Sequence, residues 1–485
     1  MSADSALVKQ ANFINGAWTA ADSGQTIDVN NPATGDVIGS IPRCGRTETA
    51  RAIEAAHVAF KSWGRTTANE RAALMHKLGD AIMARHDELA RILTSEMGKP
   101  LAEAKGEIAL GVNYIRFFAE EAKRIYGDII PSPWPGKRLL VSKEPVGVVG
   151  AITPWNFPNS MIARKMGAAL AAGCTMVIKP ATQTPYSALV FGALAEEVGF
   201  PAGVLNVITG SAAEIAAEMC ENPNLRKITF TGSTAVGKTL ASAASAHMKK
   251  ISMELGGNAP FIVFNDADLD AAVAGAMISK FRNSGQTCVC ANRLYVQAGV
   301  YDAFSAKLSE AMNEQLNVGN GMEDGTTQGP LIDGNAVAKV EEHIEDALAK
   351  GGSLVTGGKR HDKGGSFFEP TLVANVTSDM KVAREETFGP LAPLFKFDTE
   401  EEVIARANDT EYGLACYFFT QDLGRTFRVM ESLEYGLIGV NEGLITTEVA
   451  PFGGMKDSGM GTEGSKYGVN DYLHIKYACV GGLGM

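Results

Sequence analysis

Residues 146–180 read VGVVGAITPWNFPNSMIARKMGAALAAGCTMVIKP. The short apolar runs at the two ends, 146–152 and 175–180, predict buried strands, and the segment 163–173 between them has the composition of a helix. Further apolar runs follow at 203–210, 227–232 and 259–266, with helical segments at 187–199 and 236–248. Strands that alternate with helices at this spacing form a parallel sheet with helices on its faces. Because the alternation resumes from 261 to about 440, the sequence predicts an α/β fold with two parallel-sheet domains.

The region before this stretch is predicted to be largely helical. Residues 47–63 and 69–98 place apolar residues at helical spacing behind the capping-type residues Thr47 and Asn69, and another helix is expected after Pro100. The segment PSPWPGKR, residues 131–138, predicts a turn that leads into an edge strand.

Composition limits the class of protein. A chain of 485 residues exceeds what one hydrophobic core usually serves, so two or three domains are expected. The 55 acidic and 44 basic side chains give a net charge of −11, which argues against nucleic-acid or membrane partners. The odd number of cysteines, seven, does not suggest a disulfide framework, and we expect no metal site. With no signal-peptide pattern and no run near the roughly 18 apolar residues of a spanning helix, the sequence predicts a cytoplasmic protein.

One motif points to nucleotide triphosphates. GSTAVGKT, residues 232–239, matches a phosphate-binding loop, and the later APFIVFNDAD resembles the acidic strand that accompanies such loops. This pattern makes a nucleotidase or kinase the alternative class, although short motif matches carry false positives. A helix N-terminus behind a glycine turn binds any anion, however, including the pyrophosphate of a dinucleotide. The motif therefore leaves both classes open.

A second set of motifs suggests thiol chemistry. GQTCVCANR, residues 285–293, carries Cys288 and Cys290, and a reactive thiol needs a base or a site that favours the thiolate. Glu254 in SMELGGNAP is a candidate base, because an apolar setting raises a carboxyl pKa; the alternative is a structural glutamate. Asn156 in TPWNFP lies between two prolines and either donates its amide to an oxyanion or is a turn residue.

Together these segments resemble a known family. TPWNFP, IKPATQTP, FTGSTAVGK, MELGGNAP, GQTCVCANR, EETFGP and PFGGMKDSGMGTEG occur in the order found in the aldehyde dehydrogenase superfamily and span nearly the whole chain. The tail EGSKYGVNDYLHIKY, with FRNSGQTCVCANR and MIARKMGAAL, is similar to the succinate-semialdehyde dehydrogenase branch, of which glutarate-semialdehyde dehydrogenases are near relatives. The resemblance implies oxidation of a small carboxylated aldehyde, most closely succinate semialdehyde.

The resemblance also assigns roles to residues. Cys288 matches the nucleophile that forms a thiohemiacetal and then a thioester, and Asn156 with the Cys288 N–H matches the oxyanion hole. Glu254 matches the base that activates the deacylating water, and Glu463 in the C-terminal motif is expected to support proton transfer. The cofactor-binding residues that the resemblance implies are Trp155, Lys179, Thr182, Gly232, Ser233, Glu386 and Phe388.

Substrate and cofactor preferences follow from the same likeness. Arg164 and Arg282 match positions that bind the distal carboxylate, and Thr446 and Thr447 are expected to add a hydroxyl contact. NAD-preferring relatives carry a glutamate where this chain has Thr182, so the sequence predicts NADP, with NAD used less well. Asn159, Ser160 and Thr462 depart from the pattern of the branch, which usually has small residues at the first two positions and arginine at the third.

Two expectations remain, one for Cys290 and one for the domains. Cys290 is either a packing residue or a redox partner of Cys288, because in an extended segment residues i and i+2 share a face and lie roughly 6.5 Å apart. The predicted domains are a cofactor-binding domain (1–123 and 147–256), a catalytic domain (257–450) and a β oligomerisation element (124–146 and 470–485). The family forms dimers or tetramers, so a homodimer or homotetramer is expected.

Overall fold

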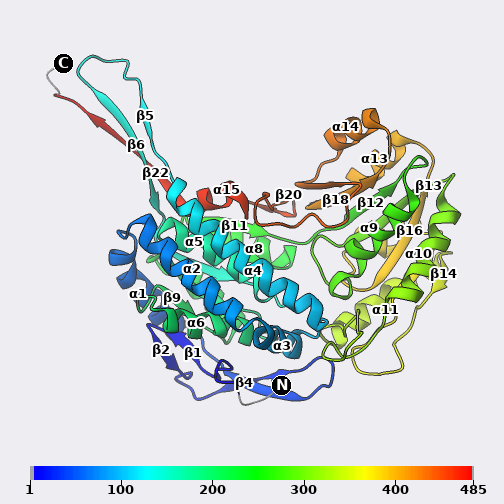
Figure 1. Cartoon of the computed structure of the whole chain (residues 1–485), viewed down its shortest axis with the longest axis horizontal. Helices are drawn as coiled ribbons and strands as arrows, with labels where there is room; N and C mark the ends of the chain where they lie inside the picture. Colours follow the sequence, from blue (N-terminus) through cyan, green and yellow to red (C-terminus); the bar gives the residue numbers. More distant parts are fainter. Residues whose placement is uncertain (1–4, 483–485) are drawn as a thin grey trace.

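The computed structural model describes residues 5–482, which form two α/β lobes and a projecting arm (Figure 1). The first lobe is built around an eight-stranded sheet with the order β2-β1-β9-β8-β7-β10-β11-β21. Pairing is parallel from β9 to β11 and antiparallel at both edges. Its strands are β1 (Asn12–Ile14), β2 (Ala17–Thr19), β7 (Val148–Ile152), β8 (Thr175–Lys179), β9 (Leu205–Val207), β10 (Leu225–Thr231), β11 (Lys250–Glu254) and β21 (Gly459–Met460).

Helices pack on this sheet and bury its central strands. Every residue of β8 is buried, as expected for a parallel strand covered on both faces. The helices of this lobe are α1 (Arg46–Trp63), α2 (Ala68–Ala84), α3 (His86–Met97), α4 (Leu101–Glu121), α5 (Ser160–Ala172), α6 (Tyr186–Val198), α7 (Ala212–Glu221) and α8 (Thr234–Ser245). The alternation predicted from the sequence is confirmed.

The second lobe contains a seven-stranded sheet with the order β14-β15-β16-β13-β12-β18-β19, in which only β14 is antiparallel to its neighbour across residues 5–482. Its strands are β12 (Ala259–Val263), β13 (Ala291–Gln297), β14 (Ser353–Thr356), β15 (Thr371–Ala374), β16 (Leu391–Phe397), β18 (Ala415–Phe419) and β19 (Leu437–Val440). Its helices are α9 (Leu269–Phe281), α10 (Tyr301–Gln315), α11 (Gly334–Ala349), α12 (Lys381–Arg384), α13 (Glu400–Asn408) and α14 (Leu423–Ser432). The predicted second α/β unit is therefore confirmed.

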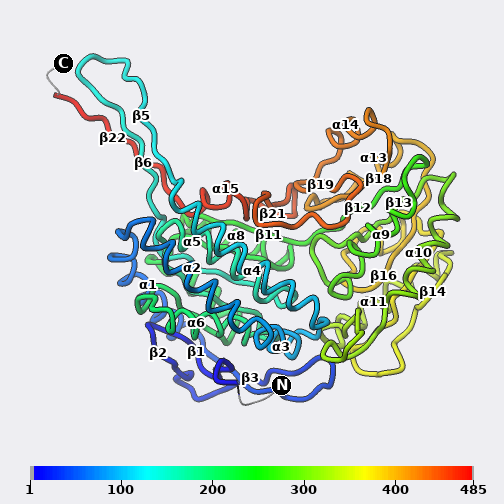
Figure 2. The backbone as a smooth tube through the Cα atoms, viewed as in Figure 1, coloured from blue at the N-terminus to red at the C-terminus, as the bar shows by residue number. Residues whose placement is uncertain are grey.

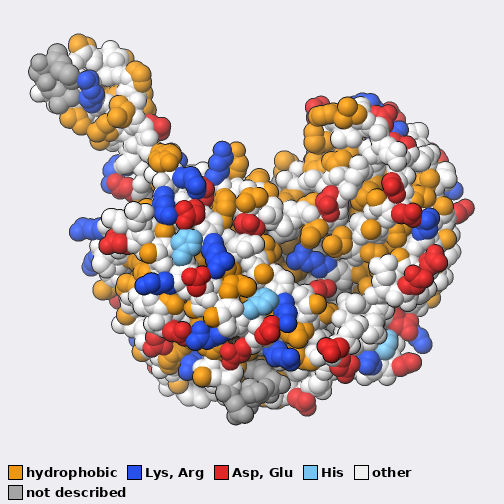
Figure 3. All heavy atoms as spheres, viewed as in Figure 1, with side chains coloured by type: hydrophobic (Ala, Val, Ile, Leu, Met, Phe, Trp, Pro, Cys, Tyr) orange, Lys and Arg blue, Asp and Glu red, His pale blue; other side chains and the backbone are white. Residues whose placement is uncertain are grey.

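The arm is an antiparallel sheet with the order β22-β6-β5 that projects from the first lobe (Figure 2). Residues 131–138 make the expected turn between β5 (Asp128–Ile130) and β6 (Arg138–Pro145). The expected edge position of β6 is wrong, because β22 (Leu473–Val480) pairs along its whole length. Apolar side chains are exposed on this arm, among them Ile129 at 76% and Ile475 at 75% (Figure 3).

Short elements complete the fold. They are β3 (Thr26–Asn30), β4 (Val37–Pro42), β17 (Tyr412–Gly413), β20 (Met455–Lys456), α15 (Ser465–Gly468) and the 3-10 turns η1 (Ala122–Arg124), η2 (Arg282–Gly285) and η3 (Val469–Tyr472). Within the described chain, no helix is both long and apolar enough to span a bilayer.

Two helix starts differ from expectation. The residues that precede α1 and α2 are Gly45 and Thr67, two positions before the expected Thr47 and Asn69. The Thr67 hydroxyl accepts the Glu70 N–H at 3.2 Å while the Glu70 carboxylate accepts the Thr67 N–H at 2.7 Å. This reciprocal cap outcompetes Asn69, which lies inside the first turn.

The first sheet reverses its strand order between β7 and β10. From β7 the chain adds β8 and β9 on one side, and from β10 it adds β11 on the other. The loops that leave the carboxyl ends of β7 and β10 therefore diverge and leave a crevice, which is where open α/β sheets bind ligands. The second lobe faces this crevice.

Candidate active site

A cavity of about 240 Å³, called here the first cavity, lies at the strand reversal. The loop after β7 contributes Trp155 and Asn156, and the loop after β10 contributes Gly232 and Ser233. The second lobe closes it with Glu386, Phe388 and Cys288, and the Trp155 and Phe388 rings meet edge to face at 5.5 Å. The structure thus brings together most of the cofactor-binding residues expected from the sequence.

A second cavity, of about 50 Å³, lies on the other side of Cys288. Arg164, Arg282 and Thr446 line it, together with Ser160, one of the positions that departs from the branch pattern. Its remaining walls are mainly apolar and aromatic: Leu110, Tyr114, Phe157, Met161, Ile278, Val289, Tyr417, Leu444, Ile445 and Phe452. Cys288 lines both cavities, so its thiol lies where their contents meet.

Cys288 lies in a turn. The Cys290 N–H donates to the Thr287 carbonyl at 3.1 Å, which places Cys288 and Val289 in the middle of the turn. The expectation of an extended segment here is therefore wrong, and with it the spacing derived for the two thiols. Burial raises the pKa of the Cys288 thiol to about 12, although the Arg164 guanidinium acts in the opposite direction.

The two cysteines have different surroundings. Cys290 is 1% exposed and lines neither cavity, and its Sγ accepts a hydrogen bond from Lys280 Nζ at 3.2 Å. Lys280 also donates to Asn292 Oδ1 at 3.1 Å. The Cys290 thiol is therefore a packed group inside the second lobe, whereas Cys288 is open to both cavities.

The Asn156 side chain reaches toward the Cys288 turn. Its Nδ2 donates one hydrogen to the Gln286 carbonyl at 2.9 Å. The other hydrogen remains for a group bound in the first cavity, and within residues 5–482 the Oδ1 atom has no hydrogen-bond partner. This is the arrangement expected of an amide that stabilises an oxyanion.

Glu254 ends β11 and is 1% exposed. Neither carboxylate oxygen has a hydrogen-bond partner in the described part of the chain. Burial, reinforced by the negative charge of Glu463, raises the Glu254 pKa well above its usual range. The side chain lines neither cavity, so it must turn toward Cys288 to act there.

Lys179 and Thr182 follow the neighbouring strand. Lys179 is the last residue of β8 and pairs in register with Ile152 of β7, next to the strand reversal. Burial lowers its pKa to about 8. Thr182 is half-buried in the segment that follows. Neither lines the first cavity.

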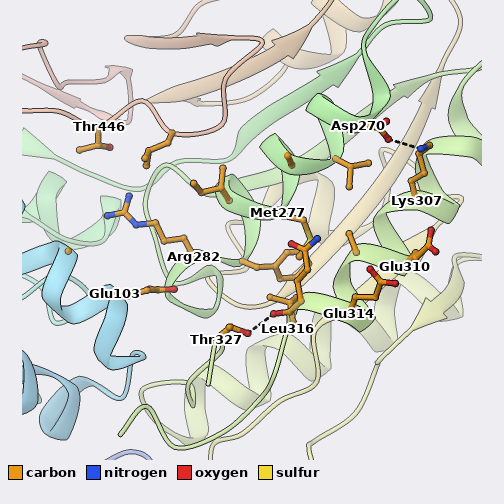
Figure 4. A pocket seen from close by; sticks show the side chains of 18 of the residues that line it. Glu103, Asp270, Met277, Arg282, Lys307, Glu310, Glu314, Leu316, Thr327 and Thr446 are labelled. Atoms are coloured by element: carbon orange, nitrogen blue, oxygen red, sulfur yellow. Dashed lines mark hydrogen bonds and ion pairs between the residues drawn. The ribbon is translucent and has the colours of Figure 1, made fainter. Parts of the chain in front are cut away.

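An outer groove of about 840 Å³ shares part of its lining with the second cavity. Arg282 and Thr446 line both spaces, and Figure 4 shows the Arg282 side chain between Glu103 and Thr446. Thr447 lines neither: its carbonyl accepts the Tyr114 hydroxyl at 3.3 Å and its own hydroxyl donates to Glu448 at 3.2 Å. The structure therefore brings Thr446 to the site but not Thr447.

The triphosphate interpretation of GSTAVGKT is wrong. Helix α8 begins at Thr234, so Gly237 and Lys238 lie inside the helix and cannot wrap around a phosphate. Lys238 instead pairs with Asp457 at 2.5 Å on the surface. The acidic segment after β12 belongs to the other sheet.

Comparison with known proteins agrees with this geometry. Residues 18–478 match the aldehyde dehydrogenase family. The chain belongs to the aldehyde dehydrogenase family. It is 61% identical to a glutarate-semialdehyde dehydrogenase of Pseudomonas aeruginosa and 59% identical to an NADP(+) succinate-semialdehyde dehydrogenase of Escherichia coli, with 99% of each chain covered in both cases. The crystal structure of succinate-semialdehyde dehydrogenase from Burkholderia pseudomallei superposes with a TM-score of 0.98 at 58% identity over 99% of both chains.

Sequence reasoning missed part of this aldehyde dehydrogenase site. The aromatic walls of the second cavity, Tyr114, Phe157, Tyr417 and Phe452, come from four separate segments. Tyr114 has the spacing of a core residue on a helix, and nothing in its neighbours marks it as a lining residue. The Gln286 carbonyl accepts the Asn156 amide, and the sequence could not predict this contact because every residue has a main-chain carbonyl.

Proposed function

We propose that this aldehyde dehydrogenase oxidises succinate semialdehyde to succinate with NADP, through a thioester on Cys288. The observation that carries the proposal is the position of Cys288 between a cavity at the strand reversal and a cavity that ends at Arg282. An aldehyde bound to Cys288 places its chain in the second cavity, and a distal carboxylate then meets the guanidinium. The printed names of the relatives at 59–61% identity support a semialdehyde substrate.

The first cavity fits a nicotinamide group. Two buried polar atoms of its lining residues, Asn156 Oδ1 and Thr231 Oγ1, have no hydrogen-bond partner within residues 5–482. Both can therefore form hydrogen bonds with a bound ligand. A Cβ added at Gly256 would meet Glu386 Oε2 at 3.1 Å and Thr234 Oγ1 at 3.2 Å, so a side chain here would crowd the cavity wall. A bound nicotinamide cofactor supplies the hydride acceptor.

The protein groups act in sequence around the aldehyde carbon. The Cys288 thiol loses its proton to solvent and its sulfur forms the C–S bond, and the Asn156 amide and Cys288 N–H donate to the resulting oxyanion. Loss of hydride from the same carbon leaves the thioester. Glu254, with its raised pKa, then takes a proton from the water that attacks the thioester, which breaks the C–S bond and releases the acid.

The second candidate substrate is glutarate semialdehyde, which is one carbon longer. The 61% identity to an enzyme of that name favours it, and so does the outer groove next to the second cavity, which Arg282 also lines. The reaction and catalytic residues are the same for both aldehydes, so only kinetics separate them.

The test is the appearance of reduced nicotinamide with succinate semialdehyde, glutarate semialdehyde and butanal, each with NADP and with NAD. The highest kcat/KM is expected for succinate semialdehyde with NADP, and Cys288→Ala is expected to abolish turnover while Cys290→Ala keeps most of it. A higher kcat/KM for glutarate semialdehyde would assign the five-carbon substrate. Turnover of butanal as efficient as that of both semialdehydes would exclude a carboxylate-selective site.

We further propose that the arm, β5, β6 and β22, joins copies of the chain into a homodimer or homotetramer. The support is the exposed apolar surface of a sheet that projects beyond the lobe it belongs to. The three predicted domains stay as proposed, with residues 1–4 and 483–485 outside the described range, and a cytoplasmic location remains a prediction.

A further inference from the structure

A buried ion pair lies behind Asn156. Lys99 precedes α4 and Glu107 lies in its second turn. The Lys99 Nζ is 2.6 Å from Glu107 Oε2, and the two side chains are 0% and 1% exposed. Neither residue lines the first or the second cavity. Burying two charges is costly unless each also makes good hydrogen bonds, so their remaining partners indicate what the pair does.

The lysine holds the main chain of Asn156. Its Nζ donates to the Asn156 carbonyl at 2.8 Å and lies 3.8 Å from the centre of the Phe157 ring. Asn283 Nδ2 donates to the same carbonyl at 3.0 Å and to the Gln286 carbonyl at 3.1 Å. Since Gln286 also accepts the Asn156 side-chain amide, the loop after β7 and the Cys288 turn are fixed to each other.

The glutamate holds the other end of the same loop. Its Oε1 accepts the N–H groups of Asn159 at 2.9 Å and Ser160 at 3.1 Å, where α5 begins. A carboxylate at a helix N-terminus satisfies free N–H groups and is favoured by the helix dipole. One ion pair therefore clamps the loop from Asn156 to Ser160 at both ends, with Lys99 at the start and Glu107 at the finish.

We propose that Lys99 and Glu107 are positioning residues that aim the Asn156 amide at the oxyanion, an inference that rests on the oxyanion role in the proposed function. Neither residue touches the substrate. An oxyanion donor acts only when it is held at hydrogen-bond distance from the charge that develops, and small displacements reduce the rate strongly. The clamp supplies that constraint from α4, through contacts that reach Asn156 by its main chain.

The test uses a variant that leaves no unpaired buried charge, Lys99→Met combined with Glu107→Gln. Glutamine keeps an acceptor for the start of α5, and methionine removes the donor to Asn156. We expect kcat to fall about tenfold to hundredfold, the loss produced by a displacement of about 1 Å. The KM for the aldehyde and the affinity for NADP are expected to stay near wild type. The control Lys105→Met, which removes an exposed lysine of the same helix, is expected to change nothing.

A double-mutant cycle separates positioning from general damage. In an Asn156→Ala background the same pair of changes is expected to cause less than a twofold further loss, because groups that act as one unit are not additive. Additive losses, or wild-type kcat in the Lys99→Met, Glu107→Gln variant, would overturn the proposal. If that variant does not fold, Asn283→Ala replaces it in the cycle, because this change removes the other donor to the Asn156 carbonyl. Additive losses with Asn156→Ala, or wild-type kcat in Asn283→Ala, would then overturn the proposal.

Cleavage of an activated ester tests the clamp without any aldehyde substrate. Cys288 is expected to attack p-nitrophenyl acetate without a cofactor, and the same oxyanion forms. A wild-type protein that cleaves the ester but oxidises none of the aldehydes would contradict the proposed function and leave the clamp testable through the ester rate. Ester cleavage that Asn156→Ala does not slow would overturn the clamp proposal, because there would be no oxyanion amide to position.

Discussion

Arg164 Nε lies 2.6 Å from Glu463 Oε2, and each side chain is 4% exposed. The Arg164 guanidinium also stacks 4.1 Å from the Phe452 ring in the wall of the second cavity. Arg164 thus shares the Glu463 carboxylate with Lys165 while it also lines the second cavity. Arg282, in contrast, forms no ion pair within residues 5–482 and lines the second cavity, so we propose it as the main contact of a substrate carboxylate.

Arg282→Ala is therefore expected to raise the KM for succinate semialdehyde on the order of thirtyfold, about 2 kcal/mol, the loss typical of a truncated charge pair. The KM for butanal should hardly change. Lys307→Ala is the matched control, because Lys307 lines the outer groove but pairs with Asp270 at 2.6 Å. Similar increases for charged and uncharged aldehydes would show that Arg282 supports the fold rather than the substrate.

Arg164→Ala has a different expected signature. It removes one of two cations from the buried Glu463, whose other partner is Lys165. Because a buried carboxylate with fewer partners destabilises the fold, the unfolding temperature of this variant should drop by several degrees, whereas that of Arg282→Ala should not. Differential scanning calorimetry of both variants measures this, and an unchanged melting temperature for Arg164→Ala would contradict the structural role of the pair.

Glu254→Gln should stop the reaction after hydride transfer. The amide cannot accept a proton from water, so up to one reduced cofactor per active site should form before the protein stalls as a thioester. Rapid-mixing absorbance measures the burst, and intact mass measures the trapped acyl group. Steady turnover at the wild-type rate would remove Glu254 from the mechanism.

Thr182→Glu should shift cofactor preference from NADP toward NAD. A carboxylate beside Lys179 hydrogen-bonds a ribose 2′-hydroxyl and repels a 2′-phosphate, so kcat/KM for NADP should fall about tenfold or more while that for NAD is kept or rises. Thr182→Gln, which adds length without charge, is the control. A wild-type protein that uses NAD as efficiently as NADP would contradict this prediction before any variant is made.

NADP binding should weaken as pH rises above about 8. Burial lowers the Lys179 pKa to about 8, so the lysine is charged below that pH and loses its proton above it. The bound phosphate and ribose hydroxyls favour the charged form, so the Kd should rise by at most about tenfold per pH unit above 8. Fluorescence titration between pH 6.5 and about 9.5 measures it. Lys179→Met should bind weakly without this pH dependence, and a flat wild-type profile would exclude Lys179 from the phosphate site.

Cys290 has two interpretations that one experiment separates. As a redox partner it forms a reducible disulfide with Cys288, for which its Sγ must first give up the hydrogen bond from Lys280. Mild peroxide should then inactivate the enzyme and dithiothreitol should restore it, while Cys290→Ala should recover poorly because Cys288 over-oxidises. Equal recovery of the variant and the wild type would leave Cys290 as a packing residue.

The sequence by itself determined the class of fold and where on it the candidate catalytic residues lie. Runs such as 146–152 and 175–179 are largely apolar without alternation, which is typical of strands in a parallel sheet covered on both faces. Asn156 and Ser233 follow predicted strands and Lys179 lies near the end of one, and the carboxyl ends of parallel strands meet at one edge of the sheet. Local order along the chain was enough to place these residues near one another.

Tertiary structure alone decided what those residues contact. The ion pair of Arg164 with Glu463 joins residues about 300 positions apart along the chain, and no local pattern encodes such a pairing. The turn at Cys288, the helical position of Lys238 and the central place of β6 depend likewise on partners that sequence spacing does not reveal. Lys99 and Glu107 look like ordinary helix-surface charges in the sequence. They are buried in the folded chain, where they pair with each other and hydrogen-bond the loop from Asn156 to Ser160.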